Sequence, residues 1–454
     1  MKNSILLLLF VFVSACQSTT EVKTISPISP QDMAEGIIYE VNIRQFTEEG
    51  TFNAFVKELP SIKELGVNIL WLMPTYPIST TKSKGPLGSY YAVSDYKGVN
   101  PEFGTLEELK NLVDQAHALG IYVIFDWVPG HTGWDHVWLN DHPEYYLKND
   151  AGKIIDPIDP RTGQSFGWTD VADLDYDQPT MREAMKEAML YWVKELDIDG
   201  YRVDQSYAIP IDFIEDTFSA IREIKPVFIM GEIEQHSGQN EYLKYFDGSY
   251  DFPGYEINVE VAQGKKNVLD IDTHLVEFVQ DHDPSHHLLN FVSTHDKNAW
   301  NGTARERFGK AQGAIMAANY TMPGMPFIYS GVEYDLDKRL LFFEKDSFPK
   351  VKGDTYKLLQ KLGELKRTHP ALNAGKEAGS FTRIETSLNE KVLAFERSKK
   401  GDTIIFMANL SNEHIGFTSP YNGKFKRFED GRQKRLSFSY EYRMRPWEFW
   451  ILTN

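Results

Sequence analysis

The sequence predicts an α/β fold, a (β/α)8 TIM barrel, on three observations. Short apolar runs alternate with segments of helical periodicity, a pattern typical of parallel strands joined by crossover helices. Eight such runs follow one another, which favours a closed barrel over an open sheet. Acidic residues stand at the ends of several runs, and the C-terminal strand ends carry the active sites of such barrels.

The predicted elements follow in order along the chain. Strands are expected within residues 36–46, 67–74, 121–128, 200–205, 227–232, 250–253, 288–296 and 325–331. Helices are expected at Phe52–Leu65, Leu106–Leu119, Met181–Leu196, Phe213–Ile224 and Ala311–Asn319, with a last one at Tyr356–Arg367. The barrel therefore occupies residues 35–372.

Two segments depart from the barrel pattern. Between about residues 131 and 172, Trp, Asp, His, Pro and Gly crowd together without helical periodicity, which predicts a short excursion after the third strand. Residues 373–454 alternate in stretches such as VLAFER and DTIIFMANL, and these predict an antiparallel β domain at the C-terminus.

Residues 1–16 are expected to be a lipoprotein signal peptide. The apolar run from Ile5 to Val13 is too short to span a bilayer, and the stretch VSAC resembles a bacterial lipobox, whose cysteine is lipidated. Cys16 is the single cysteine of the chain, and a plain secretory signal with an incidental cysteine is the alternative. Residues 17–34 would be a flexible tether. We therefore expect an extracytoplasmic protein anchored through Cys16 to a bacterial membrane, the outer membrane, on its periplasmic or surface side.

The composition excludes one class of partner. A formal net charge of -17 argues against nucleic acid, whose phosphates call for a basic surface. A neutral, hydroxyl-rich substrate is compatible with this charge. Aromatic residues make up 13% of the chain, and several stand in polar stretches such as WDHVW and PEYY, where a ring could stack on a sugar or simply belong to the core.

Charged residues gather at the predicted strand ends. They are Asp126 and His131, Arg202 and Asp204, Glu232, and His295 and Asp296. A single acid at a strand end is often only a helix N-cap. Several acids that converge would destabilise the folded protein through desolvation and repulsion. Such a cluster is typical of a functional site, so their coincidence favours an active site.

The acids divide into roles by their surroundings. Arg202 and Asp204 share one face of a strand, so we expect the arginine to lower the pKa of Asp204 and keep it an ionised nucleophile. Glu232 follows the apolar strand VFIM, which favours a protonated general acid. Two carboxyl groups of unequal protonation are the arrangement of glycoside hydrolysis, with Asp296 as a third acid that stabilises positive charge.

The ordered motifs DWVPGH, VADLD, GYRVD, GE and FVSTHD resemble the conserved regions of glycoside hydrolase family 13, the α-amylase family. The likeness extends through YYAVSDYKGVNPEFGT and MPFIYSGVE and covers residues from about 36 to 454. It implies a catalytic barrel, a domain B inserted after the third strand, a C-terminal β-sandwich and retaining hydrolysis of α-glucosidic bonds.

The resemblance assigns roles to residues of this chain. It places the nucleophile at Asp204, the acid/base at Glu232 and the transition-state stabiliser at Asp296. It implies substrate binding by Tyr91, His131, Arg202 and His295.

Four residues at three places depart from the family pattern. Gly130 and Thr294 replace asparagines, and Ser206 with Tyr207 replaces a Lys-His pair that helps bind the leaving side of the glucan. Many relatives hold calcium through the side-chain oxygen of the first of these asparagines, which glycine lacks. Calcium is therefore disfavoured, and we expect no metal or other cofactor.

The leading functional hypothesis is an α-amylase-type hydrolase of α-1,4-linked starch-like glucans and maltooligosaccharides. An α-glucosidase or maltogenic exo-acting enzyme of the same family is the alternative, and a transglycosylase is a weaker one. A non-catalytic glucan-binding or partner barrel is the hypothesis from a different class, and the presence of all three acids argues against it.

Overall fold

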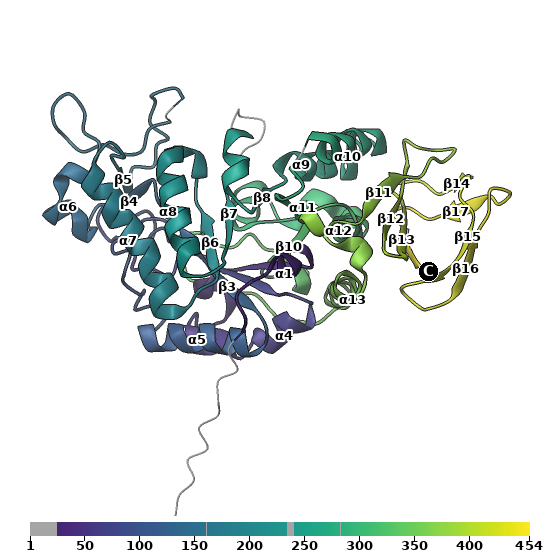
Figure 1. Cartoon of the computed structure of the whole chain (residues 1–454), viewed down its shortest axis with the longest axis horizontal. Helices are drawn as coiled ribbons and strands as arrows, with labels where there is room; N and C mark the ends of the chain where they lie inside the picture. The colour runs from purple at the N-terminus through teal and green to yellow at the C-terminus, as the bar shows by residue number, and fades with distance from the viewer. Residues whose placement is uncertain (1–24, 160, 234–239, 282) are drawn as a thin grey trace, which may run out of the picture.

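The computed structural model describes residues 25–159, 161–233, 240–281 and 283–454 (Figure 1). Eight parallel strands close into a barrel in the order β1-β10-β9-β8-β7-β6-β3-β2. They are β1 (Ile38–Val41), β2 (Ile69–Leu72), β3 (Tyr122–Trp127), β6 (Gly200–Val203), β7 (Phe228–Gly231), β8 (Gly248–Tyr250), β9 (His287–Asn290) and β10 (Met325–Tyr329). The predicted barrel is confirmed, because each predicted strand segment overlaps one of these strands.

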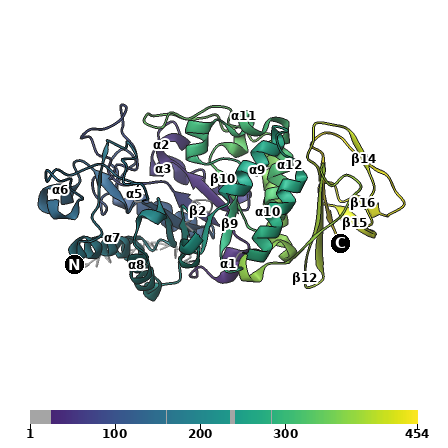
Figure 2. The same cartoon turned by 90° about the horizontal axis from the view of Figure 1, so that it is seen from above.

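Helices surround the barrel, and Figure 2 shows them from above. They are α2 (Ile43–Phe46), α3 (Phe52–Val56), α4 (Leu59–Glu64), α5 (Leu106–Ala118), α7 (Pro179–Leu196), α8 (Ile211–Ile224), α9 (Phe252–Ala262), α10 (Val268–Asp281), α11 (Ala304–Phe308), α12 (Gln312–Thr321) and α13 (Asp354–Thr368). The helix predicted at Phe52–Leu65 is divided into α3 and α4, with Pro60 in the first turn of α4, where a missing N–H does no harm.

Helices α9 and α10 are absent from the sequence prediction. The Pro253-Gly254 pair of α9 has the character of a helix breaker, but both residues lie in its first turn. Asp251 caps that turn by accepting a hydrogen bond from the Gly254 N–H at 3.0 Å. A local cap therefore turns an apparent breaker into a helix start.

Helix α5 shows how local sequence and packing agree. The Thr105 hydroxyl accepts from the Glu108 N–H, and the Glu108 carboxylate accepts from the Thr105 N–H, which forms a capping box. Apolar residues at helical spacing then face the barrel, where Leu109, Leu112 and Val113 are fully buried.

The predicted excursion is a separate small domain between β3 and β6, which we call domain B. It begins with β4 (His131–Gly133) and ends with β5 (Val171–Asp173), and these two strands pair antiparallel, with His131 opposite Asp173. Helix α6 (Val137–Asp141) lies between them. Because domain B leaves the barrel at the end of β3 and its two terminal strands pair with each other, it lies beside the end of the barrel where β3 ends (Figure 1).

The C-terminal domain contains a six-stranded antiparallel sheet in the order β11-β12-β13-β18-β15-β16 and a two-stranded sheet, β14-β17. The strands are β11 (Ser380–Arg383), β12 (Val392–Lys399), β13 (Asp402–Asn409), β14 (Ile415–Phe417), β15 (Gly423–Arg427), β16 (Gln433–Leu436), β17 (Tyr442–Met444) and β18 (Phe449–Thr453). Alternate residues of β12 join different cores: Leu393 and Phe395 join the core shared with the barrel, and Val392 and Ala394 the core of this domain.

The segment before β1 is more ordered than predicted. Ile28 is 2% exposed within the barrel core, and α1 (Pro30–Ala34) begins at a capping box formed by Ser29 and Asp32. The predicted flexible tether over residues 17–34 is therefore wrong for its last part, because burial of Ile28 and Ala34 fixes this segment against the barrel. The predicted signal peptide and Cys16 lie outside the described residues.

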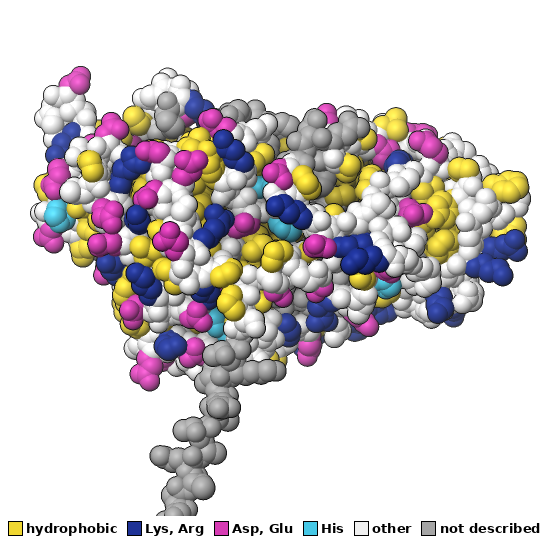
Figure 3. Space-filling view, in the orientation of Figure 1, with side chains coloured by type: hydrophobic (Ala, Val, Ile, Leu, Met, Phe, Trp, Pro, Cys, Tyr) yellow, Lys and Arg dark blue, Asp and Glu magenta, His cyan; other side chains and the backbone are white. Residues whose placement is uncertain are grey.

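Two further observations concern the surface. Acidic and basic side chains intermingle over the barrel on the face shown in Figure 3. Among the described residues, every helix is too short or too polar to cross a lipid bilayer.

Candidate active site

A cavity of about 390 Å³ opens at the C-terminal ends of the barrel strands. Six of the seven predicted site residues line it: Tyr91, His131, Asp204, Glu232, His295 and Asp296. They come from the segments that follow β2, β3, β6, β7 and β9. The barrel thus brings together residues that lie more than 200 positions apart in the chain.

Arg202 lies beneath this cavity and binds three carboxylates. Its guanidinium donates to Asp126 at 2.9 Å and to Asp204 at 2.7 Å, and it pairs with Glu232 at 2.9 Å. Strand register explains the first contact, because Asp126 on β3 stands opposite Arg202 on β6. Arg202 is 1% exposed and does not line the cavity. This placement makes it a positioning group for the acids, whereas the sequence prediction grouped it with the substrate-binding residues.

Aromatic rings enclose the guanidinium on its remaining sides. The rings of Trp71, Tyr91 and Tyr250 lie 5.1, 5.8 and 6.0 Å from it. Such cation–π contacts help to stabilise a cation that has lost its water. The buried arginine is therefore stabilised by both carboxylates and rings.

Burial dominates the protonation of the two acids that share Arg202. It raises the pKa of Asp204 to about 6, although the guanidinium acts in the opposite direction. It raises the pKa of Glu232 to about 7, again against Arg202. The prediction that Arg202 keeps the pKa of Asp204 low is wrong in net direction, because desolvation outweighs the attraction. Burial thus raises the pKa of both acids, and the difference in protonation between Glu232 and Asp204 stays a prediction.

The two histidines of the cavity differ in charge at neutral pH. Burial lowers the pKa of His131 to about 4, so this imidazole is neutral. Burial would also lower the pKa of His295, but the carboxylates of Asp296 and Glu40 raise it to about 9. His295 is therefore an imidazolium, and it adds positive charge beside the acids.

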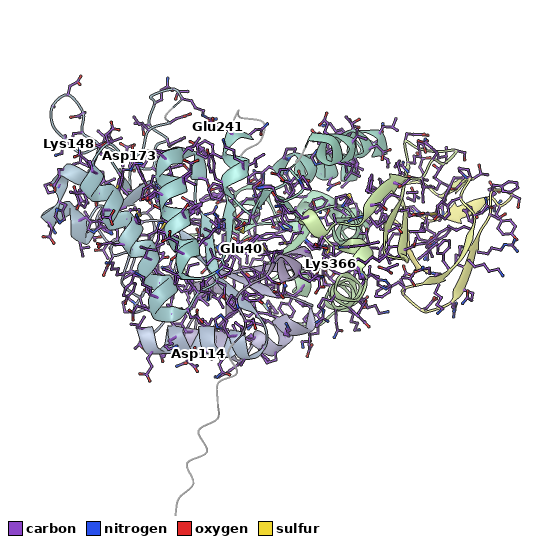
Figure 4. The ribbon with its side chains drawn as sticks, in the orientation of Figure 1. Glu40, Asp114, Lys148, Asp173, Glu241 and Lys366 are labelled. Carbon is purple, nitrogen blue, oxygen red and sulfur yellow. The ribbon has the colours of Figure 1, made fainter. Side chains whose placement is uncertain are left out.

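Glu40 is a site residue that the sequence prediction missed. It projects from β1 in the middle of the barrel (Figure 4) and is fully buried. One carboxylate oxygen contacts Nδ1 of His295 at 2.5 Å, and the other accepts from the His295 N–H at 3.3 Å. A lone glutamate within the apolar run IIYEV was the available signal, because such a residue needs a buried partner.

Tyr91 connects the two sides of the cavity. Its hydroxyl donates to Asp126 at 3.0 Å and lies 3.0 Å from Nε2 of His295. Its ring stacks on the His295 ring at a centroid distance of 5.5 Å. Asp296 lies 3.4 Å from the same nitrogen of His295 and is the most exposed of the three predicted catalytic acids.

Further lining residues, most of them in loops, were not predicted. They are Lys84, Ser89, Trp168, Asp170, Val171, Gln205, Trp300, Phe342 and Phe343. The aromatic stretches WDHVW and PEYY, by contrast, lie outside the cavity. Tyr145 and Tyr146 in the second stretch are buried and belong to the core that domain B shares with the barrel.

Gln205 has a left-handed backbone with a φ of 42° directly after Asp204. This unusual conformation directs its N–H to the Glu232 carboxylate, at 3.0 Å. Ser206, which occupies a position where the family often has lysine, is buried and donates from its hydroxyl to the Val203 carbonyl at 2.9 Å. The chain after the nucleophile position therefore supports the acids rather than projecting a cation into the cavity.

The junction between the barrel and domain B is held by direct hydrogen bonds. The Gly130 carbonyl accepts from the Leu174 N–H at 3.1 Å, and the Tyr96 hydroxyl donates to the His131 carbonyl at 2.9 Å. Asp173, labelled in Figure 4, accepts from the Ile158 N–H at 3.2 Å. Within the described part of the chain, no three His, Cys, Asp or Glu side chains are grouped as metal ligands.

Comparison with known proteins gives one family. The family model described as the α-amylase catalytic domain matches residues 24–389. α-Amylase 3 of Dictyoglomus thermophilum is 27% identical over 66% of this chain and 64% of its own length, and a cyclomaltodextrinase of Thermoanaerobacter pseudethanolicus is 26% identical over 84% and 69%. The chain thus spans slightly less than two thirds of the first of these relatives.

A solved structure shares the whole architecture. The noncanonic maltogenic α-amylase of Thermotoga neapolitana superimposes with a TM-score of 0.83, at 25% identity, over 93% of this chain and 99% of its own. The barrel and the C-terminal β domain therefore occur together in that protein as well.

Proposed function

The chain belongs to the α-amylase family, and on that premise we propose that it hydrolyses α-1,4-glucosidic bonds in starch-like glucans and maltooligosaccharides with retention of configuration. One observation carries the proposal: Asp204 and Glu232, both with pKa values raised by burial, share the Arg202 guanidinium at 2.7 and 2.9 Å and line the same cavity. Two neighbouring carboxyl groups of unequal protonation are what double displacement at an anomeric carbon requires.

In the first step Glu232 donates its proton to the glycosidic oxygen. The bond from that oxygen to the anomeric carbon breaks, and the Asp204 carboxylate forms a covalent ester with the anomeric carbon. The proton leaves with the new hydroxyl group of the departing sugar. Arg202 remains bound to both acids and limits their movement.

In the second step the Glu232 carboxylate removes a proton from water. The water oxygen attacks the anomeric carbon, and the bond to Asp204 breaks. Glu232 is protonated again, and Asp204 is again a free carboxylate. Two inversions restore the α-configuration.

The remaining cavity groups bind the reacting sugar in this scheme. His131 is neutral and can both donate and accept, whereas the His295 imidazolium only donates to sugar hydroxyls. The Asp296 carboxylate opposes the positive charge that develops on the ring in the transition state. Tyr91 offers its ring as a stacking surface.

Proton NMR of the first products tests the proposal. Incubation with maltotriose and starch should give products whose new reducing ends are initially α-anomers. An initial β-anomer would show single displacement and contradict the assigned roles. Absence of any glucan cleavage would leave the non-catalytic barrel as the better reading.

We also infer that the enzyme needs no calcium. The family's calcium site uses an asparagine oxygen where this chain has Gly130, and calcium requires six to eight oxygen ligands. The hydrogen bonds of the Gly130 and His131 carbonyls already join domain B to the barrel, so they offer an alternative to a bridging ion.

Attachment to a membrane through Cys16 is a further proposal, supported by the sequence VSAC at the end of an apolar run. Wild-type protein should appear in the membrane fraction, and the Cys16→Ala variant should be released from it. Equal membrane retention of both would refute the lipid anchor.

A further inference from the structure

The order of strands around the barrel defines two ends of the cavity. In the ring β1-β2-β3-β6-β7-β8-β9-β10, β1 lies directly across from β7, which carries Glu232. The proposed acid protonates the oxygen of the leaving sugar, so the reducing-end part of a glucan lies on the β7 side. We take the bound glucan to cross the mouth of the barrel, so that the ring attacked by Asp204 directs its O4, and any further units toward the non-reducing end, at β1 and its neighbours.

Lys84 and Asp170 close the cavity on one flank of that far side. Lys84 belongs to the loop after β2 and Asp170 to domain B, and both line the cavity. Their side chains form an ion pair at 2.7 Å. The pair joins two segments that leave the barrel from different strands, so it forms a continuous rim between them.

The loop after β10 continues the rim. The Leu87 N–H donates to the Phe343 carbonyl at 3.1 Å, which joins the β2 loop to the β10 loop. The loops approach so closely at Gly85 that a Cβ there would lie 2.5 Å from the Cβ of Phe343, and the positive φ of 65° also requires glycine. A side chain at position 85 would push the two loops apart.

Arg44, which follows β1, fixes this rim from behind. Its guanidinium donates to the carbonyls of Leu87 and Gly88, each at 3.2 Å, and pairs with Glu102 at 2.9 Å. Arg44 is 1% exposed. Because this buried arginine bonds to three partners, it fixes the position of the loop after β2 and therefore of the rim.

Aromatic rings complete the far side next to β9. The Phe342 ring lies 5.5 Å from Trp300 and 6.4 Å from Tyr91. We call Lys84, Asp170, Trp300, Phe342 and Phe343 the wall; they come from loops after β2, β3, β9 and β10, and all of them line the cavity.

We propose that this wall stops the non-reducing end of the glucan, so that the enzyme removes short products of one length from chain ends instead of cutting within chains. The proposal rests on the hydrolase function above, because the direction of the chain is set by the role of Glu232. The wall stands opposite that acid, where a longer chain would have to pass.

A capped substrate tests the wall. Two substrates are compared: maltoheptaose itself, and maltoheptaose whose non-reducing 4- and 6-hydroxyls are bridged by an ethylidene group. The products are separated and identified by mass. Wild-type enzyme should cleave the capped chain about 100-fold more slowly than the uncapped one. It should also release one product size from starch at early times. Cleavage of both chains at rates within about twofold would overturn the wall but leave the hydrolase function intact. Cleavage of neither would refute the hydrolase function itself.

Variants show whether the wall causes the exclusion. Lys84→Ala combined with Phe343→Ala should raise the ratio of capped to uncapped cleavage about tenfold. Lys186→Ala is the matched control, because it also removes a lysine paired with a carboxylate, Asp216 at 2.9 Å, but on α7. Its ratio should equal that of wild type. If thermal melting shows the double variant folded and its ratio is unchanged, the wall assignment is wrong.

Discussion

We call Glu40, Asp126, Arg202, Asp204 and Glu232 the floor of the cavity. The floor and the wall are held together by different kinds of interaction. The floor consists of charged side chains at or near strand ends, and Glu40, Asp126 and Arg202 in it are at most 1% exposed. The wall consists of loop residues, and its Trp300 is 56% exposed. Charges buried without water must be paired, so the floor allows few substitutions. The wall is joined by a partly exposed ion pair and ring contacts, which allows chain-end selection to vary without disturbing the chemistry.

The largest expected effect is on the floor. Asp204→Asn and Glu232→Gln should each lower kcat by about 10³- to 10⁴-fold, because each removes one of the two proposed reacting groups. Steady-state rates on maltotriose and binding of an unreacted glucan measure this. Asp216→Asn on α8 is the control, since this exposed acid lies outside the cavity. Near-wild-type rates in either catalytic variant would remove that residue from the mechanism.

The second prediction compares one ion pair from each region. Arg202→Met should reduce the free energy of unfolding by about 3–5 kcal/mol, because it leaves several buried carboxylates unpaired. Lys84→Met should cost less, about 1–3 kcal/mol, because it leaves only the buried Asp170 unpaired and the lysine itself is partly exposed. Without Arg202 the pKa values of the carboxyls rise further. Their protonated forms are then favoured in the folded state, so the loss should be larger at pH 8 than at pH 5. Denaturant titrations at both pH values measure it, and equal losses for the two variants would contradict the contrast.

The floor should also set the pH profile. Asp204 must be ionised, and its pKa is raised to about 6; Glu232 must be protonated, and its pKa is raised to about 7. Activity should therefore fall about tenfold per pH unit below the first value and above the second. Measurement of kcat/KM from pH 4 to 9 checks this. A flat profile across that range would show that these two groups do not control the rate.

Substitution of an aromatic residue of the wall should reduce activity less than substitution of an acid of the floor. Trp300→Ala removes an exposed stacking surface, so KM for maltooligosaccharides should rise about fivefold while kcat changes little. Steady-state kinetics on maltotriose separate the two parameters. A fall in kcat as large as that of Glu232→Gln would mean that the wall takes part in the chemistry.

Removal of calcium, which would act at the junction between the barrel and domain B, should change activity and stability least. Dialysis against EDTA should leave activity unchanged and the melting temperature within about 1 °C, because direct hydrogen bonds join the two parts and Gly130 offers no side-chain ligand. A large loss of both, restored by added calcium alone, would show that a calcium ion is required after all.

The N-terminal and central parts of the chain each contain one segment whose structure the local sequence did not predict. The tether prediction relied on composition, rich in Ser, Thr and Pro, yet Ile28 is buried in the barrel core. Helix α9 was missed because Phe252 and Pro253 were assigned to a predicted strand, whereas the Asp251 cap starts a helix there. In both cases a tertiary contact or cap outweighed a local tendency.

Local patterns were enough to predict the barrel, its strands in order and the acids Asp204, Glu232 and Asp296, because period and strand-end position are local properties that the parallel register then aligns. The pair Arg202 and Asp204 is two residues apart on one strand, so its contact needed no long-range information. Local sequence could not predict that burial raises the pKa of Asp204 more than Arg202 lowers it. Desolvation depends on all the groups packed around the carboxyl, so it requires the tertiary structure. The tertiary structure alone decided the partnership of Glu40 with His295 and the wall, because these join residues from distant segments whose approach is set by loop geometry that no local pattern encodes.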